Sequence, residues 1–335
     1  MTRPRVWLAM DVTLPLQLFS GESWAALARV ADVAPGPPLG EFGTDRAAAA
    51  LAETEVLLTG WGCPRIDEDI LDAAPRLRAI VHAAGSVKGH VAAAAWDRGI
   101  QVSSAAAANA LPVAEYTVAM ILLAGKRAHR IVREYRRRRG AIDLLAEYPH
   151  LGNYQRTVGV IGASKIGRRV IELLRPFDFT VLLADPFADE TVATALGARL
   201  VDLDTLLAGS DVVSLHAPDL PSTQRLLDRS RLARIPDGAT LINTARGALV
   251  DHDALIDELA TGRFEAVLDV TDPEVLPVTS PLYALDNVVL TAHLAGAQGN
   301  ELRRLADTAI AEIGRFAAGE PLHHAVSADQ LTIMA

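Results

Sequence analysis

Short apolar runs alternate with helix-length segments along the whole chain, and this alternation restricts the fold more than any other feature of the sequence. Continuous apolar runs joined by helices are typical of strands in a parallel sheet that is covered on both faces. In the first third of the chain, helices are expected at 67–74 and 91–98. The strands expected there are Val6–Met10, Val56–Gly60, Ala79–Ala83 and Gln101–Ser104.

The alternation restarts after a break that is expected at 105–109. A helix is predicted over 113–126, with Pro112 at its start, and a more basic helix over 129–139. Another helix is predicted over 165–174. The strands expected in this part are Thr157–Gly162, Thr180–Asp185, Asp211–His216, Ala239–Ala245, Phe264–Asp269 and Val288–His293.

The pattern predicts an α/β protein of two Rossmann-like or flavodoxin-like parallel-sheet domains with a cleft between them. A length of 335 residues suits two domains better than one. The last helix, at about 300–318, is expected to return to the first sheet. The first domain is therefore expected to be discontinuous, formed by 1–104 plus 295–335, and the second to take 105–294.

Charge and cysteine content bear on partners and compartment. The formal net charge is −9, from 41 acidic and 32 basic residues, which disfavours nucleic acid and anionic membranes because both bind through Lys and Arg. The single cysteine, Cys63, cannot form an intrachain disulfide, which fits a reducing cytoplasm. No spacing of His and Cys indicates a metal site. No apolar segment is expected to reach the roughly 20 residues that span a bilayer, so a soluble, cytoplasmic protein is expected.

Arginines cluster at the end of the basic helix, at positions 133, 136, 137, 138 and 139. Blocks of like charge usually face solvent. We expect a solvated helix end, or an arm packed on an acidic neighbouring subunit, rather than a nucleic-acid surface.

A glycine-containing turn lies between the strand predicted at 157–162 and the helix predicted at 165–174. The dinucleotide fingerprint in this context is G-x-G-x-x-G, with a pyrophosphate held at the helix N-terminus. The middle glycine is replaced here by Ser164, whose side chain must turn away from the phosphates or bond one of them. The cofactor-binding residues expected in this turn are Gly162, Ser164, Lys165, Ile166 and Gly167.

Taken alone, the turn fits an ordinary strand–turn–helix without a ligand equally well, and Asp185 favours the cofactor. Asp185 ends the next predicted strand, near the spacing of about 20 residues at which an acid meets the adenosine ribose. A carboxylate there accepts hydrogen bonds from the ribose hydroxyls and repels a 2′-phosphate, so NAD is favoured over NADP. The alternative role of Asp185 is to cap the turn before Pro186.

Three polar residues follow strands predicted in the second domain. Arg246 directly follows one strand, Glu274 lies in the loop after the next, and His293 ends the last. Open parallel sheets bind ligands at the carboxyl ends of their strands. Each residue alone has a simpler explanation, as a surface arginine, a solvated glutamate or a satisfied buried histidine. Together, behind a cofactor turn, they favour catalysis.

These residues stand in motifs that resemble the D-isomer-specific 2-hydroxyacid dehydrogenase family. The motifs are Asn243-Thr244-Ala245-Arg246-Gly247, Leu268-Asp269-Val270-Thr271-Asp272-Pro273-Glu274 and Thr291-Ala292-His293, with Asn109-x-x-Pro112-Val113-Ala114-Glu115 and His216-x-Pro218 before Thr223 upstream. The likeness extends over most of the chain and is closest to glyoxylate and hydroxypyruvate reductases. It implies an NAD-dependent oxidoreductase that transfers a hydride between the nicotinamide and a small 2-oxo or 2-hydroxy acid.

The resemblance also implies a role for each residue. Arg246 would pair with the substrate carboxylate and polarise the 2-carbonyl. His293 would exchange a proton with the carbonyl oxygen, and Glu274 would orient the imidazole. The backbone around Gly85 and Ser86 would bind the substrate carboxylate. Further cofactor contacts are implied at His216, Pro218, Thr223, Thr244, Ala245, Gly296 and, beside the nicotinamide carboxamide, Asp269.

The sequence departs from the family pattern in the loops around the expected site. Ala292 replaces the usual proline before the histidine, and Ala295 replaces a usual glycine, so the loop beside the nicotinamide is expected to be narrowed. Lys88 stands where an acid is usual, and it either faces solvent or binds a second anionic group of the substrate. Formate dehydrogenases of this type carry Gln at the position of Glu274, which counts against formate as the substrate.

The resemblance further implies a homodimer, in which an arm at about 113–150 embraces the cofactor domain of the partner. Two other functions remain open. One is an NAD-binding corepressor, since corepressors of this superfamily carry the same Arg, Glu and His set, although the sequence shows neither the extra tails nor the peptide-binding surface expected of one. The other is a catalytically inactive regulatory protein that binds cofactor without turnover.

Overall fold

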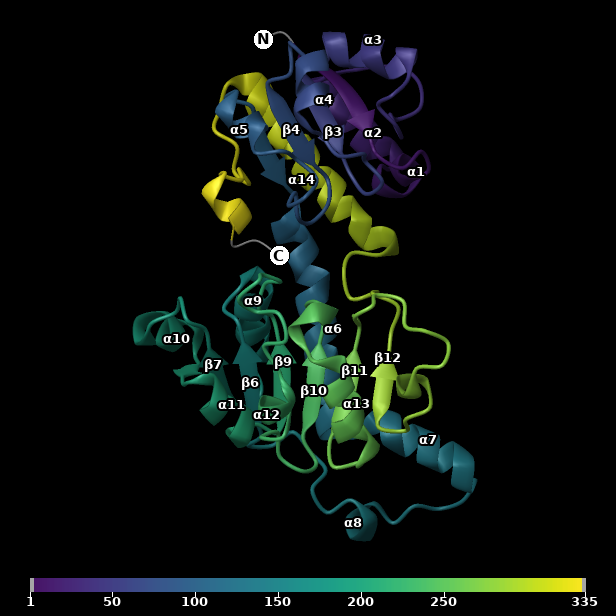
Figure 1. The fold of residues 1–335 in the computed structure, drawn as a ribbon, viewed down its shortest axis with the longest axis vertical. Helices are drawn as coiled ribbons and strands as arrows, with labels where there is room; N and C mark the ends of the chain where they lie inside the picture. The colour runs from purple at the N-terminus through teal and green to yellow at the C-terminus, as the bar shows by residue number, and fades with distance from the viewer. Residues whose placement is uncertain (1–2, 333–335) are drawn as a thin grey trace. The chain divides into compact units, whose positions relative to one another are not determined.

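The computed structural model describes residues 3–332, which form two compact units. Unit 1 takes the described residues of Met1–Ala110 and Ala297–Ala335, and unit 2 takes Leu111–Gly296. Both units are built on a parallel sheet (Figure 1). The chain leaves unit 1 within a helix and enters it again just before the last long helix.

Unit 1 contains a five-stranded parallel sheet with strand order β2-β1-β3-β4-β5. Its strands are β1 (Arg5–Ala9), β2 (Asp32–Val33), β3 (Val56–Thr59), β4 (Ala79–His82) and β5 (Gln101–Ser104). β3 and β4 are buried along their whole length, which explains why each is apolar up to its last residue, Thr59 in β3 and His82 in β4. The four predicted strands are confirmed. The edge strand β2 escapes the apolar pattern because it has only two residues, neither of them buried.

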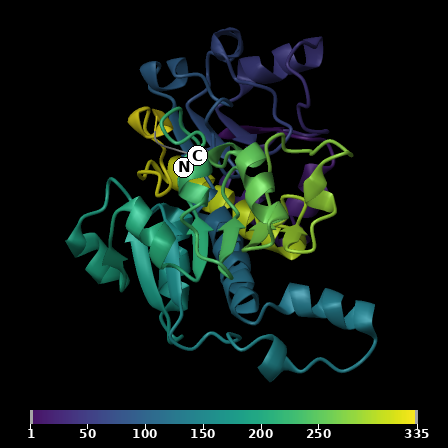
Figure 2. The same cartoon turned by 60° about the horizontal axis from the view of Figure 1, so that its bottom comes forward.

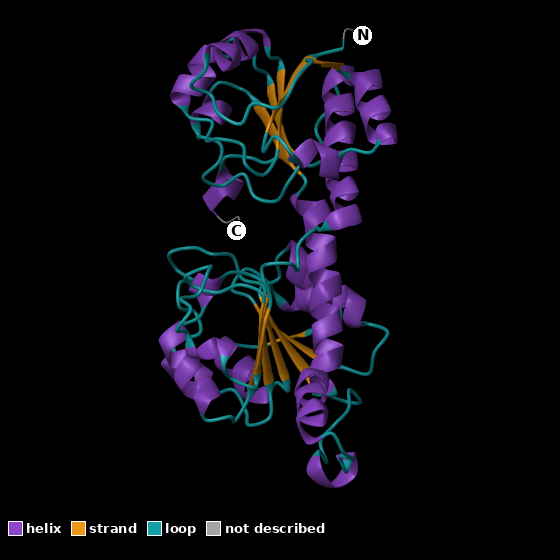
Figure 3. Ribbon diagram, turned by 90° about the vertical axis from the view of Figure 1, so that its right-hand side faces the viewer, coloured by secondary structure: helices purple, strands orange, loops and turns teal. Residues whose placement is uncertain are grey.

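Helices cover both faces of this sheet (Figure 3). One face packs against α1 (Leu14–Leu18), α2 (Gly21–Val30) and α14 (Leu302–Ala318). The other packs against α3 (Asp45–Glu53), α4 (Glu68–Ala73) and α5 (Ala94–Asp97). The last helix therefore returns to the first sheet, as predicted. The helix predicted over 91–98 is too long, because Val91 instead forms a bridge with Ile66.

Unit 2 contains a seven-stranded parallel sheet with strand order β12-β11-β10-β9-β6-β7-β8. Its strands are β6 (Thr157–Ile161), β7 (Thr180–Ala184), β8 (Arg199–Leu200), β9 (Val212–Leu215), β10 (Thr240–Asn243), β11 (Glu265–Leu268) and β12 (Val288–Leu290). The chain moves outward from β6 in one direction through β7 and in the other through β9. The carboxyl end of β6 is therefore a switch point, where open α/β sheets bind ligands.

Helices also cover both faces of the unit 2 sheet (Figure 3). One face packs against α6 (Ala106–Gly125), α9 (Lys165–Leu174) and α10 (Glu190–Leu196). The other packs against α11 (Leu203–Gly209), α12 (Arg229–Leu232) and α13 (His252–Ala260). The predicted helix at 165–174 is confirmed at both ends. Several predicted strands are too long at their carboxyl ends, and His293 lies in the loop beyond β12.

Helix α6 differs from the prediction in its start and in its length. The break expected at 105–109 is wrong, because the helix begins at Ala106 and Pro112 lies inside it. Alanines before the proline favour helix, and the helix continues through Pro112 although the proline cannot donate a backbone hydrogen bond. By length and composition α6 is also long and apolar enough to cross a membrane, contrary to expectation. Its inner face packs on the unit 2 sheet, as in a core helix.

An arm formed by α7 (Ala128–Arg138) and α8 (Leu144–Glu147) projects from the sheet of unit 2 (Figure 2). No residue of either helix is buried in the part of the chain that the structure describes. The exposed apolar side chains of this arm are Val132, Tyr135, Leu144 and Leu145.

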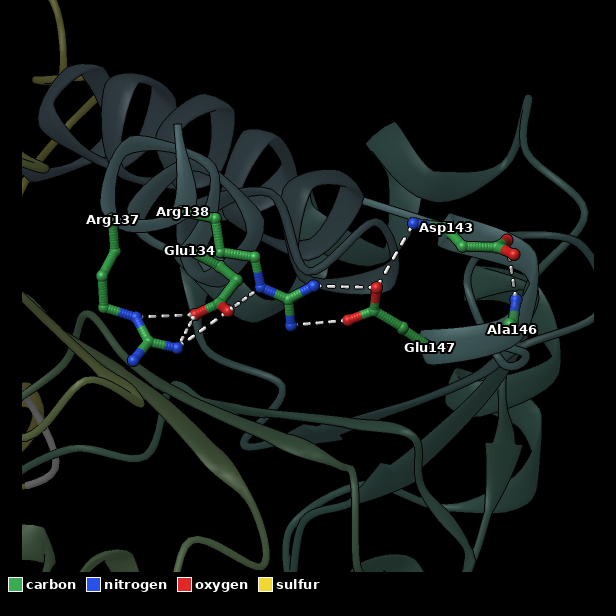
Figure 4. Close-up of polar contacts among 6 residues, drawn as sticks. All are labelled: Glu134, Arg137, Arg138, Asp143, Ala146 and Glu147. Carbon is green, nitrogen blue, oxygen red and sulfur yellow. Dashed lines mark hydrogen bonds and ion pairs between the residues drawn. The ribbon is translucent and has the colours of Figure 1, made fainter. Parts of the chain in front are cut away.

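Ion pairs hold the arm together (Figure 4). Glu134 accepts from Arg137 at 2.7 Å and also pairs with Arg138. Arg138 reaches across to Glu147 at 2.6 Å, which ties α7 to α8. Asp143 caps α8 by accepting from the backbone N–H of Ala146 at 3.1 Å. The arginines at 136–139 are therefore exposed within this chain, and part of their charge is balanced by the arm itself. Arg133 is half-buried and donates to the carbonyl of Asp286.

Candidate active site

The turn after β6 is shaped by two glycines. Gly162 has φ +97°, and a Cβ there would lie 2.8 Å from the backbone nitrogen of Ala217. A Cβ at Gly167 would lie 2.0 Å from the carbonyl oxygen of Gly162. Gly162 therefore makes the tight turn, and Gly167 lets α9 pack close against it. Together they present the N-terminus of α9 at the switch point of the sheet.

Ser164 uses its hydroxyl to cap α9. Its backbone is extended, and Oγ accepts from the N–H of Gly167 at 3.2 Å. The side chain thus turns toward the helix backbone, which is one of the two arrangements that the sequence allows. Lys165 and Ile166 open the helix, and first-turn N–H groups lack intrahelical acceptors and favour anions.

Asp185 links the turn to the end of β7. Its Oδ2 accepts from the N–H of Ala163 at 2.5 Å, and its Oδ1 accepts from the N–H of Phe187 at 2.7 Å. The turn-capping role is therefore present in the structure. An ionised carboxylate has about four acceptor positions, so Asp185 can still accept from ribose hydroxyls.

His216 is buried and neutral. Its Nε2 lies 2.8 Å from Oγ of Ser214, and Nδ1 has no partner among the described residues. Burial lowers the pKa of His216 to about 3, so it carries no charge toward a phosphate. The loop beyond it is closed by Thr223, whose hydroxyl donates to the carbonyl of Pro218 at 2.6 Å. This segment can serve a cofactor through its backbone and shape.

Arg246 lies in the turn that follows β10. Asn243 fixes this turn, because its side chain accepts from the N–H of Ala245 at 3.0 Å and donates to the carbonyl of Arg246 at 2.9 Å. The guanidinium donates to the carbonyl of Ala245 at 2.7 Å. Within residues 3–332 no carboxylate forms an ion pair with Arg246, so its charge is available to an anion. The hydroxyl of Thr244 lies 2.9 Å from that of Thr117 on α6.

His293 and Glu274 are brought together as predicted. Nδ1 of His293 lies 2.6 Å from Oε1 of Glu274, and about half of each side chain is exposed. A carboxylate on Nδ1 places the proton of a neutral imidazole there and leaves Nε2 for proton exchange. The loop that carries Glu274 is fixed by Thr271, whose hydroxyl donates to the carbonyl of Pro273 at 2.8 Å.

Asp269 has a structural role that the sequence does not reveal. Its side chain is 2% exposed and accepts from the hydroxyl of Thr291 at 2.6 Å. It also accepts from the N–H groups of Leu294 and Ala295 at 2.9 and 3.0 Å. Asp269 therefore organises the turn that carries His293. Its predicted contact with the nicotinamide stays a prediction, as does that of Gly296 at the end of this turn.

Gly85 and Ser86 lie in unit 1, in the loop after β4, and their role in substrate binding stays a prediction. Ser86 Oγ accepts from the N–H of Lys88 at 3.2 Å, and the side chain of Lys88 is exposed.

His82, the last residue of β4, is a buried polar residue that the sequence does not single out. Its Nδ1 lies 2.8 Å from the hydroxyl of Thr59, and burial, helped by the neighbouring His90, lowers the pKa of His82 to about 3. The available signal was a polar residue ending an apolar strand.

No group of three or more His, Cys, Asp or Glu residues in the described chain could hold a metal ion.

Comparison with known proteins identifies the family to which the chain is similar. Residues 118–295 match the model of the D-isomer specific 2-hydroxyacid dehydrogenase, NAD binding domain. The chain is 35% identical over 289 residues to D-3-phosphoglycerate dehydrogenase of Mycobacterium tuberculosis (strain ATCC 25618 / H37Rv), covering 84% of this chain and 53% of the relative. It is 34% identical over 261 residues to glyoxylate reductase of Thermofilum pendens, covering 76% of each. Among solved structures, TT0316 protein from Thermus thermophilus has a TM-score of 0.76 at 30% identity, covering 96% of this chain and 100% of that one.

The chain spans about half the length of the phosphoglycerate dehydrogenases that it matches and 76% of the glyoxylate reductase. The matched segment includes the Gly162 turn and the residues Arg246, Glu274 and His293. The motifs, the fold and the matched model agree. This chain belongs to the D-isomer-specific 2-hydroxyacid dehydrogenase family, and residues 118–295 are its NAD-binding domain.

Proposed function

We propose that this protein is an NAD-dependent oxidoreductase that interconverts a small 2-oxo acid and the corresponding 2-hydroxy acid. The observation that carries the proposal is the 2.6 Å contact between His293 Nδ1 and Glu274 Oε1, in the unit that also holds the Gly162 turn. Relatives named glyoxylate reductase and D-3-phosphoglycerate dehydrogenase support this class of substrate.

The turn after β6 fits a dinucleotide. Gly162 and Gly167 leave no room for a Cβ, so the N-terminus of α9 is packed tightly into the turn. The N–H groups of Lys165 and Ile166 would bind the pyrophosphate, and Asp185 would accept from the adenosine ribose and disfavour a 2′-phosphate. When bound, the nicotinamide would supply or accept the hydride.

The residues around the reacting carbon would bind substrate and move a proton. Arg246 would hold the substrate carboxylate and polarise the 2-carbonyl, a task suited to its planar, permanently charged guanidinium. His293 would give a proton from Nε2 to the carbonyl oxygen during reduction and take it back during oxidation. Glu274 would keep the ring in the required orientation by accepting a hydrogen bond from Nδ1.

The first test follows NADH and, separately, NADPH absorbance with glyoxylate, hydroxypyruvate, pyruvate and longer 2-oxo acids. We expect NADH oxidation with at least one acid, and its loss in Arg246→Ala. Arg229→Ala is the matched control, since Arg229 forms an exposed pair with Asp257. A clear preference for NADPH would contradict the role of Asp185. Tight NADH binding without turnover of any acid would favour an NAD-binding corepressor or an inactive regulatory protein.

The α7–α8 arm is proposed to join two copies into a homodimer. Its apolar side chains Val132, Tyr135 and Leu145 are exposed in the single chain, and large exposed apolar groups in one place indicate an interaction surface.

The acidic net charge and the single cysteine support a cytoplasmic protein that binds neither nucleic acid nor membrane.

A further inference from the structure

A chain of hydrogen bonds ties helix α6 to the turn that carries His293, and we infer that Tyr116 and Thr291 are positioning residues for this histidine. The inference rests on the proposed function, in which His293 exchanges the proton. Tyr116 and Thr291 would contact neither the substrate nor the imidazole, and would act through Asp269.

The turn at His293 has an unusual backbone. His293 has φ +52°, in the left-handed region that residues other than glycine seldom adopt. Successive N–H groups of the turn converge on Asp269: that of His293 donates to its carbonyl at 2.9 Å, and those of Leu294 and Ala295 donate to its carboxylate. Successive N–H groups around an oxygen form a concave site that suits an anion. Asp269 is therefore the anion around which this turn folds.

A hydroxyl group also binds the carboxylate of Asp269, and a second hydroxyl binds the first. The hydroxyl of Thr291 donates to Oδ1 of Asp269 at 2.6 Å. Since this uses its only proton, the 3.2 Å contact between the hydroxyls of Tyr116 and Thr291 must be donated by the tyrosine. The bonds thus run in one direction, from Tyr116 through Thr291 to Asp269, and each polarises the next.

Helix α6 gives this chain a fixed base. Its inner residues Ala114 and Ile121 are fully buried against the sheet of unit 2. The residue beside Tyr116 is Thr117, whose hydroxyl lies 2.9 Å from that of Thr244, in the turn before Arg246. One turn of α6 therefore contacts both the loop that carries His293 and the loop that carries Arg246.

The arrangement predicts which kinetic constant depends on it. Glu274 holds only Nδ1 of the ring, whereas Asp269 fixes the backbone from which the ring projects. Without the hydroxyl of Thr291, Oδ1 of Asp269 loses a donor in a buried site, and the carboxylate and turn relax. The ring of His293 is then no longer held in one orientation, which slows proton exchange more than it weakens binding of substrate or cofactor.

The test compares Thr291→Val, Thr291→Ser and Tyr116→Phe in the full chain. We expect kcat to fall by about tenfold in Thr291→Val, with KM for NADH and for the oxo acid changed by less than about threefold. Thr291→Ser keeps the hydroxyl and should restore kcat to within about threefold of the unmodified protein. Tyr116→Phe should give a smaller fall in kcat than Thr291→Val.

Hydrogen exchange of the Leu294 and Ala295 amides, measured without substrate, gives a second readout. It should be faster in Thr291→Val and Tyr116→Phe and unchanged in Thr291→Ser. The matched controls are Thr54→Val, which removes a fully buried hydroxyl in unit 1, and Tyr154→Phe, which removes an exposed one. Neither should change kcat or this exchange.

Two results would overturn the inference: unmodified kcat and exchange in Thr291→Val, or a loss in Thr291→Ser as large as in Thr291→Val. If the unmodified protein turned over no 2-oxo acid, the proposed function would fail. The exchange measurement would still decide whether Tyr116 and Thr291 hold the turn.

Discussion

The pair formed by Glu274 and His293 is proposed to matter for chemistry, and its exposure means that it contributes little to stability. Both side chains are about half exposed, although the two atoms are only 2.6 Å apart. Exposed ion pairs contribute about 0–1 kcal/mol to folding. Stability therefore does not explain why the two side chains meet, and we propose that Glu274 orients the imidazole of His293 at the carboxyl edge of the sheet.

Glu274→Gln should lower kcat by about tenfold or more, because the neutral amide keeps the shape of the side chain but accepts a weaker hydrogen bond from Nδ1 of His293 and can also turn its NH2 group toward the ring. KM for NADH and the thermal midpoint of unfolding should change little. Steady-state kinetics and a melting curve would check both expectations. Glu172→Gln is a suitable control, since Glu172 forms an exposed pair with Arg169 at 2.7 Å. An unchanged kcat in Glu274→Gln would remove the orienting role from Glu274.

At the scale of single elements, apolar pattern and capping residues predict most of the structure. α9 begins and ends where the pattern predicts, because its buried residues recur at helical spacing between Ser164 and Arg175. The start of α6 is not predictable in the same way, since an alanine-rich stretch before a proline suits either a break or a helix. The edge strand β8 is too short to leave a pattern.

Some residues of the candidate site can be predicted from local sequence, and others cannot. Arg246, Glu274 and His293 are recognisable because each stands in a local motif. The relation between Tyr116 and Thr291 is not, because these residues are 175 positions apart in sequence and only the packing of α6 on the sheet brings their hydroxyls together. The role of Asp269 in the His293 turn depends on backbone N–H groups, which every sequence carries.

The cap of α9 gives a prediction for one helix. Ser164→Ala should lower the free energy of unfolding by about 1 kcal/mol, because the N–H of Gly167 loses its acceptor, and Ser164→Gly should lower it by only a few tenths. Urea unfolding monitored by circular dichroism would measure both changes. Equal losses in the two variants would mean that the hydroxyl is not the stabilising group.

The arm gives a prediction for a pair of helices. Leu145 is 89% exposed in α8, and a charge there would oppose burial of the arm in the proposed homodimer. Leu145→Asp should raise the dimer dissociation constant by about tenfold or more. Sedimentation at micromolar concentration would measure this, with Leu16→Asp as control, since Leu16 is 85% exposed in α1 of unit 1. A dimer unaffected by Leu145→Asp would place the interface elsewhere.

At the scale of the whole molecule, the chain has two cores that can be followed separately. Each unit has its own sheet, covered on both faces, and its own buried histidine: His82 in unit 1 and His216 in unit 2. All four tryptophans lie in unit 1, at positions 7, 24, 61 and 96. Tryptophan fluorescence therefore reports unfolding of unit 1, whereas circular dichroism reports both units.

The two histidines should make each unit less stable in acid. Burial lowers the pKa of His82 and of His216 to about 3 in the folded protein, while an unfolded histidine titrates near its reference value of about 6.5. Between these values the unfolded chain binds the additional proton, so stability is fully present above about pH 6.5 and is lost as the pH falls toward 3. The loss is about 1.4 kcal/mol per pH unit for each histidine.

Urea unfolding of unit 1, followed by tryptophan fluorescence between pH 4.5 and 7.5, isolates the contribution of His82. His82→Gln should flatten the dependence of the unfolding free energy on pH by about 1.4 kcal/mol per pH unit, because Gln does not titrate. His216→Gln should leave the fluorescence transition unchanged and flatten only the pH dependence of the unit 2 transition seen by circular dichroism. Equal effects of both variants on fluorescence would mean that the two units unfold as one. An unaltered slope in His82→Gln would mean that this histidine does not cause the acid instability of unit 1.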